Sequence, residues 1–301
     1  MNKSISLLLC SLSLIFILGV AYGDIDEEVL ESLKKAVVRV ELTMSRTIDR
    51  DGRVFVTTAS ATGFVVKKKT VKTKVCYLIL TVGHTPRPLS SKVMFFNPDS
   101  GRTVQAPAVI VAETGDNRQW TRFGSGIIPQ ERAIARGDFR LLWACAEKDL
   151  VGDIEPIEIR PQITDGGMPV ILVRYLPDDA NGPVVIGPDF DGKILKVVDP
   201  INREGQLVHF RVSNHSQPEG ASGSPVFDED GNLLGLCYAS FRDQTRCLPT
   251  YVSIINWLKT IGWYEYVTDD EKEVERPPVV ILGPIEPIIE PPLKKIPPKL
   301  K

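Results

Sequence analysis

The chain has 301 residues, and its 36 lysine and arginine residues nearly balance its 38 aspartate and glutamate residues. A formal net charge of −2 gives no electrostatic reason to expect binding to nucleic acid or to an anionic membrane surface. The length is sufficient for two domains of ordinary size with a substantial core.

The first residues have the pattern of a secretory signal. A basic residue near the start precedes an apolar run from Leu7 to Val20, and Ala21-Tyr22-Gly23 offers small residues for cleavage before Asp24. A retained membrane anchor is the alternative, but the apolar run is short for spanning a bilayer. We therefore expect residues 1–23 to be a signal peptide and the mature protein to be exported, either secreted or periplasmic.

The next residues predict a short helix and then strands. Acidic residues open an amphipathic helix, and from Val37 the pattern changes to alternating, β-branched residues. Asp51-Gly52 marks a hairpin, and Ala61–Val66 is typical of the strand that follows. Lysines crowd the next connection, as in a solvated hairpin tip, with polyanion binding as the alternative. They are Lys67, Lys68, Lys69, Lys72 and Lys74.

Three short motifs carry side chains suited to nucleophilic catalysis. An apolar strand ends at His84, and Asp138 directly precedes another apolar strand. Further along, Gly220–Pro225 places Ser222 between two glycines. Glycines reach backbone angles that other residues avoid and leave N–H groups free to face an oxyanion. Taken separately, each motif also fits a structural role, as a polar turn or a histidine at a strand end.

The motifs together resemble those of the chymotrypsin-like serine proteases. Thr81–His84 is similar to the family's T-A-A-H, Asp138–Leu142 to D-I-A-L-L, and Gly220–Pro225 to G-D/N-S-G-G/S-P, in the family's order. The resemblance covers roughly residues 30–262. Ser224 and the absence of a cysteine after His84 favour the bacterial branch with the glutamyl endopeptidases and, more distantly, the HtrA proteases. The chain after the resemblance is too short for a PDZ domain.

The resemblance implies an all-β fold of two six-stranded antiparallel β-barrels, with a short N-terminal helix and a C-terminal helix. The first barrel and its helix would occupy residues 24–150, and the second barrel and its helix residues 151–266. Residues 267–301 are charged and then rich in paired prolines, so we expect a disordered tail. Docking of this tail on a partner is the alternative, and the oligomeric state stays open.

The resemblance also implies an exported serine endopeptidase acting on proteins or peptides, without a cofactor or metal. In the implied mechanism His84 is the general base, Asp138 orients it, and Ser222 is the nucleophile. The backbone N–H groups of Gly220 and Ser222 would form the oxyanion hole. Ala221 replaces the aspartate that pairs with a new N-terminus in trypsin-like enzymes, so activation of that kind is not expected.

The substrate pocket is expected to be neutral, and its candidate residues come from the same resemblance. They are Ser216, Gln217, Tyr238 and Ser240. Tyr238 stands where a small hydroxyl residue often supports the catalytic aspartate, and Cys237 where glutamyl endopeptidases carry a histidine. Two other functions stay open: a catalytically silent homologue acting as a binding module, and a scaffold acting through the proline-rich tail.

Four cysteines remain after the predicted signal peptide. Export permits disulfides, and four cysteines allow three pairings. Buried free thiols are at least as consistent with the apolar strands that hold most of them. The four are Cys76, Cys145, Cys237 and Cys247.

Overall fold

The computed structural model describes most of the chain between residues 26 and 269. The described ranges are 26–48, 51, 53–84, 88–113, 138–162, 164–175, 182–187, 189–190, 193–203, 206–213, 218–241 and 243–269. The predicted signal peptide, the proline-rich part of the tail, and the pocket candidates Ser216 and Gln217 lie outside them.

The N-terminal helix forms where the sequence predicts it. Helix α2 (Glu27–Ala36) begins after Asp26, whose carboxylate accepts a hydrogen bond from the Glu28 N–H at 2.9 Å. Acidic residues in its first turn and lysines in its last turn complement the helix dipole. Leu33 and Ala36 are buried, which fixes the face of the helix that packs on the body of the protein.

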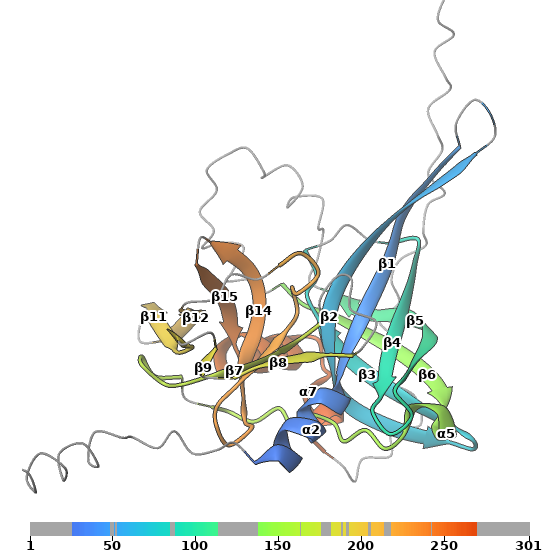
Figure 1. Cartoon of the computed structure of the whole chain (residues 1–301). Coiled ribbons are helices and arrows are strands. Elements are labelled where there is room, and N and C mark those ends of the chain that lie inside the picture. The colour runs from blue at the N-terminus through green and yellow to red at the C-terminus, as the bar shows by residue number, and fades with distance from the viewer. Residues whose placement is uncertain are drawn as a thin grey trace, which may run out of the picture.

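The first half of the molecule is a closed antiparallel barrel, ordered β1-β2-β3-β6-β5-β4 (Figure 1). The interior is filled by apolar side chains such as Val40, Phe64 and Phe95, all fully buried. Its strands are β1 (Val37–Ile48), β2 (Val54–Val71), β3 (Lys74–Thr81), β4 (Ser90–Asn97), β5 (Arg102–Glu113) and β6 (Arg140–Glu147). The short helix α5 (Lys148–Val151) follows β6 and accepts a hydrogen bond from Asn97 at the Leu150 carbonyl.

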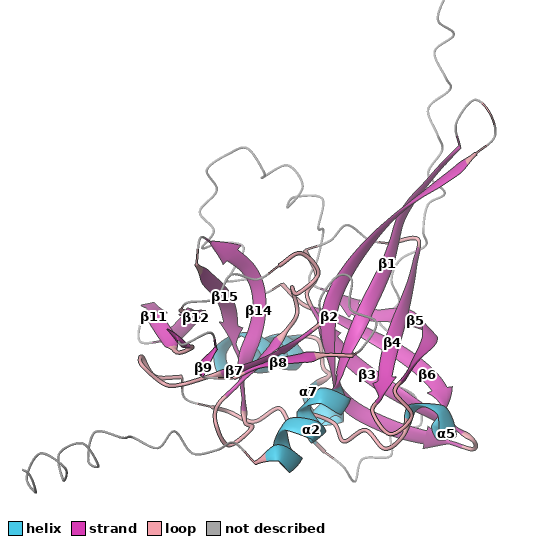
Figure 2. Ribbon diagram, viewed as in Figure 1, coloured by secondary structure: helices cyan, strands magenta, loops and turns pink. Residues whose placement is uncertain are grey.

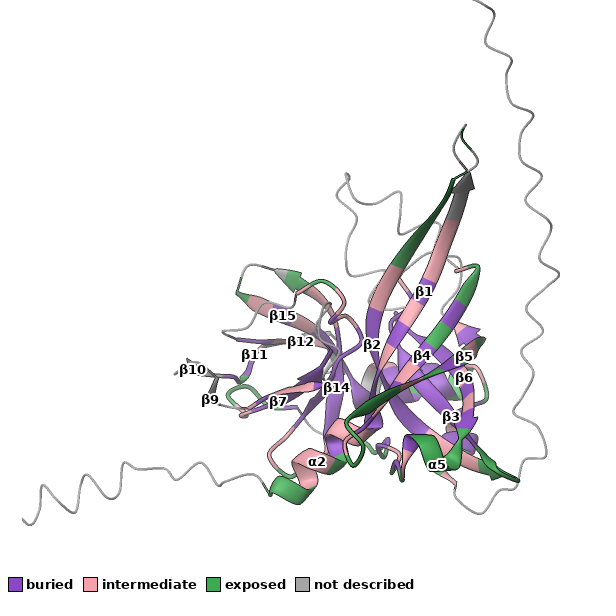
Figure 3. Cartoon of the chain, turned by 45° about the vertical axis from the view of Figure 1, so that its right-hand side comes forward, coloured by how far each residue is buried: buried purple, intermediate pink, exposed green. Residues whose placement is uncertain are grey.

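Strands β1 and β2 extend well beyond the barrel as a two-stranded ribbon (Figures 1 and 3). Their pairing continues to Ile48 and Val54. Val54, Phe55 and Val56 are exposed on this ribbon. At its other end, β2 meets β3 through a turn at Lys72, so the predicted hairpin is confirmed. Among the lysines before this turn, Lys68 pairs with Asp153 and Glu155 at the surface.

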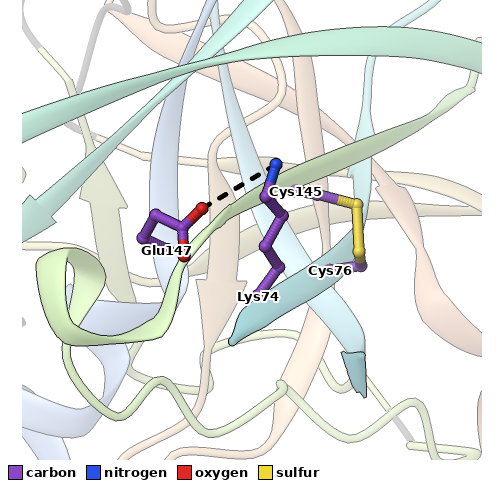
Figure 4. Close-up of a disulfide and its surroundings, with 4 residues drawn as sticks. All are labelled: Lys74, Cys76, Cys145 and Glu147. Atoms are coloured by element: carbon purple, nitrogen blue, oxygen red, sulfur yellow. Dashed lines mark ion pairs between the residues drawn. A yellow bond between two sulfur atoms is a disulfide. The ribbon is translucent and has the colours of Figure 1, made fainter. Parts of the chain in front are cut away.

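A disulfide joins two neighbouring strands of the barrel. Cys76 on β3 and Cys145 on β6 lie directly opposite each other, and their Sγ atoms are bonded (Figure 4). The ion pair between Lys74 and Glu147 lies beside this bond on the same two strands. The sequence left both disulfides and buried free thiols open, and the described residues contain one disulfide, between Cys76 and Cys145.

The second half is an antiparallel sheet of seven strands, ordered β11-β12-β15-β14-β13-β7-β8. It lies beside the barrel (Figures 1 and 2). Its strands are β7 (Ile171–Arg174), β8 (Val184–Ile186), β11 (Val197–Arg203), β12 (Gln206–Val212), β13 (Pro225–Phe227), β14 (Leu233–Phe241) and β15 (Gln244–Pro249).

The all-β, chymotrypsin-like fold class is confirmed, although the second half differs in detail from a closed six-stranded barrel. In the described residues its edge strands β8 and β11 do not pair with each other. The segment between them pairs with itself instead, as β9 (Asp189–Phe190) and β10 (Lys193–Ile194). The second sheet is therefore curved around its own core but left open at one side.

The predicted C-terminal helix is also present. A π-helical turn, η1 (Thr250–Ile255), continues into α6 (Asn256–Thr260), and α7 (Tyr264–Thr268) follows. Trp263, between α6 and α7, is fully buried. No helix within the described ranges is both long enough and apolar enough to span a membrane.

Candidate active site

His84 and Asp138 meet at one end of the barrel because β3 and β6 are antiparallel neighbours. Thr81, the last residue of β3, pairs with Arg140, the first residue of β6. The residues just after β3 and just before β6 therefore lie together. The Nδ1 atom of His84 is 2.7 Å from Oδ2 of Asp138, and the Gly83 N–H donates to Oδ1 of Asp138 at 2.8 Å.

Asp138 is held rigidly in a buried position. Only 4% of its side chain is exposed, against 31% for His84. The next residue, Phe139, is fully buried, and its ring lies 5.1 Å from that of Trp257 on α6. Both carboxylate oxygens are therefore in hydrogen-bonding contact, Oδ1 with the Gly83 N–H and Oδ2 with the His84 ring.

The environment of His84 favours its protonated form. Burial lowers the pKa of His84 and is the largest single influence. The charge of Asp138 and its hydrogen bond together outweigh burial, so the net pKa of His84 is raised. The buried Arg140 offsets part of this effect, and it is itself paired with Glu113 at 3.2 Å.

The Ser222 turn has the backbone shape that its glycines predict. Gly220 and Gly223 have φ of 84° and 94°, a region that favours glycine. Within the described residues, no hydrogen bond uses the N–H of Gly220 or of Ser222. By contrast, the intervening Ala221 N–H donates to the Pro218 carbonyl, and the Gly223 N–H to the Cys237 carbonyl. The turn therefore leaves the two N–H groups that the sequence singled out unused.

Thr62 on β2 connects the barrel to this turn through two hydrogen bonds. Its N–H donates to the Ser222 carbonyl at 2.8 Å, and its hydroxyl donates to the Gly220 carbonyl at 3.3 Å. The same hydroxyl accepts a bond from the Tyr175 N–H at 3.2 Å. On its other side, the Thr62 carbonyl accepts from the hydroxyl of Thr81 at 2.6 Å. Thr62 thus lies between the strand that ends at His84 and the turn that holds Ser222.

The approach of the turn to β2 requires a glycine. A Cβ atom on Gly223 would lie 1.9 Å from the Thr62 carbonyl oxygen and 2.7 Å from the Thr81 hydroxyl. No real Cβ contact is this short. The glycine after Ser222 is therefore required by contact between the two halves as well as by its positive φ.

Sequence reasoning did not identify Thr62, which stood inside an ordinary strand pattern. Gly63 is a glycine within the same strand, and such a glycine often marks a close approach of another backbone. A Cβ atom on Gly63 would meet Ile79, Leu80 and Val40 of the barrel, however, and not the Ser222 turn. The sequence therefore carried no local signal for the contact between Thr62 and the turn.

The remaining predicted site residues are placed as follows. Tyr238 and Ser240 lie on β14, Tyr238 partly buried and Ser240 exposed. Burial is the main cause that raises the pKa of Tyr238 to about 12, and the charge of Asp138 is among the smaller causes. Tyr238 is therefore within electrostatic range of Asp138. His209 lies on β12, where it pairs with Ile201 of β11.

The described residues contain no group of three or more histidine, cysteine, aspartate and glutamate side chains suited to hold a metal.

The barrel and the second sheet are those of the trypsin-like protease fold. Among solved structures, the chain is similar to Rv3671c from M. tuberculosis, described as a protease. Its active form shows 15% identity and a TM-score of 0.47, covering 79% of this chain and 86% of that one. A mutant in the inactive form, with serine replaced by alanine, shows 15% identity and a TM-score of 0.45, covering 79% and 94%. No protein-family model and no curated protein matches the chain.

Proposed function

We propose that the protein is an exported serine endopeptidase that cleaves peptide bonds through Ser222, His84 and Asp138. The observation that carries the proposal is the 2.7 Å contact between His84 and Asp138 beside a glycine-flanked serine turn. The contact uses Nδ1 of His84, which leaves Nε2 as the nitrogen for the serine hydroxyl. The first half of the molecule supplies His84 and Asp138, and the second half supplies Ser222.

In the proposed reaction His84 Nε2 removes the proton from the Ser222 hydroxyl as its oxygen attacks the substrate carbonyl. Asp138 holds the imidazole tautomer and stabilises the imidazolium that forms. The free N–H groups of Gly220 and Ser222 stabilise the oxyanion, each contributing about 3 kcal/mol. His84 then protonates the leaving amine, and water hydrolyses the acyl-enzyme in the second half of the reaction.

The branch and location form part of the proposal. Ser224 and the absence of a cysteine after His84 favour the bacterial branch of the glutamyl endopeptidases and HtrA proteases. The pocket in this proposal is neutral and includes Ser216, Gln217, Tyr238 and Ser240. Export rests on the pattern of residues 1–23, and the Cys76–Cys145 disulfide fits an oxidising compartment. Sequencing the N-terminus of the exported protein tests this part, and we expect it to begin at Asp24.

Labelling with a fluorophosphonate probe tests the catalytic part. We expect labelling of the wild-type protein, with the labelled peptide mapping to Ser222 rather than to the neighbouring Ser224. Ser222→Ala should abolish labelling and His84→Ala should slow it by about 1,000-fold or more. A urea unfolding curve for each variant shows that it is folded. Folded wild-type protein that is not labelled at Ser222 would contradict the proposal and favour a catalytically silent homologue.

A further inference from the structure

Two cysteines outside the proposed triad face each other in the second sheet. Cys237 on β14 and Cys247 on β15 are direct partners in the antiparallel pairing. Their Sγ atoms are 2.8 Å apart, and both side chains are fully buried in the core of the second sheet. They are the free cysteines of the described residues.

The first half of the molecule carries the same arrangement in a bonded form. Cys76 and Cys145 are also direct partners on neighbouring antiparallel strands, and there the two sulfur atoms form a disulfide. Directly opposed positions of an antiparallel pair bring Cβ atoms within the range that a disulfide needs. The 2.8 Å contact between Cys237 and Cys247 has to shorten by only about 0.8 Å to reach bond length.

We propose that Cys237 and Cys247 form a second cross-strand disulfide, made by exchange with a disulfide donor such as oxidised glutathione. The thiolate of one cysteine attacks the donor, forming a mixed disulfide and releasing one donor thiolate. The second cysteine, also as its thiolate, attacks the mixed disulfide and releases the other. The two cysteine protons pass to the donor thiolates, so the donor gains two electrons and two protons.

Burial determines when this reaction takes place. Burial raises the pKa of the Cys247 thiol well above its ordinary range, and the contact with Cys237 adds to the effect. The reactive thiolate is therefore scarce once the sheet has closed, and a donor has no access to either sulfur. The two strands are near in sequence, so their hairpin pairs early in folding. The bond is formed while this hairpin is still open to solvent.

The proposed disulfide also constrains β14, the strand that is hydrogen-bonded to the residues following Ser222. The Cys237 N–H donates to the Ser224 carbonyl at 2.8 Å, and the Cys237 carbonyl accepts from the Gly223 N–H at 2.7 Å. A disulfide at Cys237 fastens this strand to β15 at the residue that makes both contacts. The disulfide itself does not depend on the function proposed for Ser222.

Refolding and peptide mapping test the proposal. The reduced, urea-unfolded protein is refolded with oxidised and reduced glutathione, quenched with acid, alkylated and digested with trypsin. Arg242 and Arg246 lie between the two cysteines in the sequence, so trypsin separates Cys237 from Cys247 unless a disulfide joins them. We expect a linked Cys237–Cys247 peptide pair, with neither residue alkylated.

Single variants and the first disulfide provide the controls. Cys237→Ser and Cys247→Ser should each leave one alkylated cysteine, at the remaining member of the pair. Closure of Cys76–Cys145 in the same sample shows that the oxidant was effective. Alkylated Cys237 and Cys247 in folded protein whose first disulfide is closed would overturn the proposal, as would a link from either to Cys76 or Cys145. Rapid closure when oxidant is added to reduced, folded protein would overturn the argument about timing.

Discussion

Replacing Gly223 by alanine tests the contact between the Ser222 turn and the barrel. At a φ of 94°, any side chain adds about 1–2 kcal/mol of backbone strain. The new Cβ would also lie 1.9 Å from the Thr62 carbonyl oxygen. Reaching even 3.0 Å, a separation below which real Cβ contacts essentially do not occur, requires a displacement of about 1.1 Å. Such overpacking costs about 1–3 kcal/mol.

That displacement would also weaken the hydrogen bonds that Thr62 makes with Ser222 and Thr81, at about 1 kcal/mol each. We therefore expect Gly223→Ala to lower the free energy of unfolding by about 4–7 kcal/mol. Gly167→Ala is the matched control, because Gly167 has a φ of 89° but no atom within 4 Å of its added Cβ. Its expected cost is the backbone strain alone, about 1–2 kcal/mol.

Urea-induced unfolding, followed by tryptophan fluorescence, measures both variants. Gly223→Ala should unfold at a clearly lower urea concentration than Gly167→Ala, or fail to fold. The fluorophosphonate labelling rate should fall in Gly223→Ala and stay at the wild-type level in Gly167→Ala. Equal destabilisation of the two variants, to within about 0.5 kcal/mol, would show that the contact with Thr62 adds nothing.

Three further changes test the surroundings of the site. The pKa of His84 is higher in the folded protein than in the unfolded protein, so the pair of His84 with Asp138 stabilises the fold. This stabilisation is complete below the pKa of His84 in the unfolded protein, and it is lost as the pH rises through the pKa of His84 in the folded protein. Unfolding of wild-type protein and Asp138→Asn at several pH values should therefore show a difference that shrinks toward alkaline pH. Glu113→Gln should cost about 3 kcal/mol in urea unfolding, because it removes the carboxylate that pairs with the buried Arg140. Thr62→Val removes a hydroxyl that contacts the Ser222 turn and should slow fluorophosphonate labelling about tenfold, whereas Thr62→Ser should restore it.

Each of these expectations has a result that contradicts it. A stability difference for Asp138→Asn that grows with pH would reverse the assigned direction of the His84 pKa. The exposed pair of Lys74 and Glu147 provides a control for the buried one, since Glu147→Gln should cost less than about 1 kcal/mol. If Glu113→Gln cost no more than Glu147→Gln, burial of the pair of Arg140 and Glu113 would have no effect on stability. Labelling of Thr62→Val at the wild-type rate would exclude a positioning role for the hydroxyl.

Local sequence patterns predicted the features of the fold that depend on neighbouring residues. The helix start at Asp26, the change to strands at Val37 and the hairpin before Lys74 all arise from side-chain periodicity and turn chemistry. The strand positions of His84 and Asp138 were also visible, because apolar strands flank both residues. Their contact follows once these two strands are neighbours.

Features that depend on strand register were not accessible in the same way. The pairing of Cys76 with Cys145 requires β3 and β6 to be adjacent and aligned to the residue. The contacts of Thr62 require two segments, 158 residues apart in one case, to meet. The open side of the second sheet follows from β9 pairing with β10 rather than completing a barrel. No local pattern reports such long-range choices.

The position of Thr62 has a consequence for how reactivity would arise during folding. Because β2 supplies hydrogen-bond partners for the Gly220 and Ser222 carbonyls, the second sheet cannot complete the Ser222 turn by itself. A barrel folded without the second sheet would likewise hold His84 and Asp138 but not Ser222. Under the proposed function, labelling of Ser222 during refolding would report the docking of the two halves. Labelling would therefore begin only after both the barrel and the second sheet have formed.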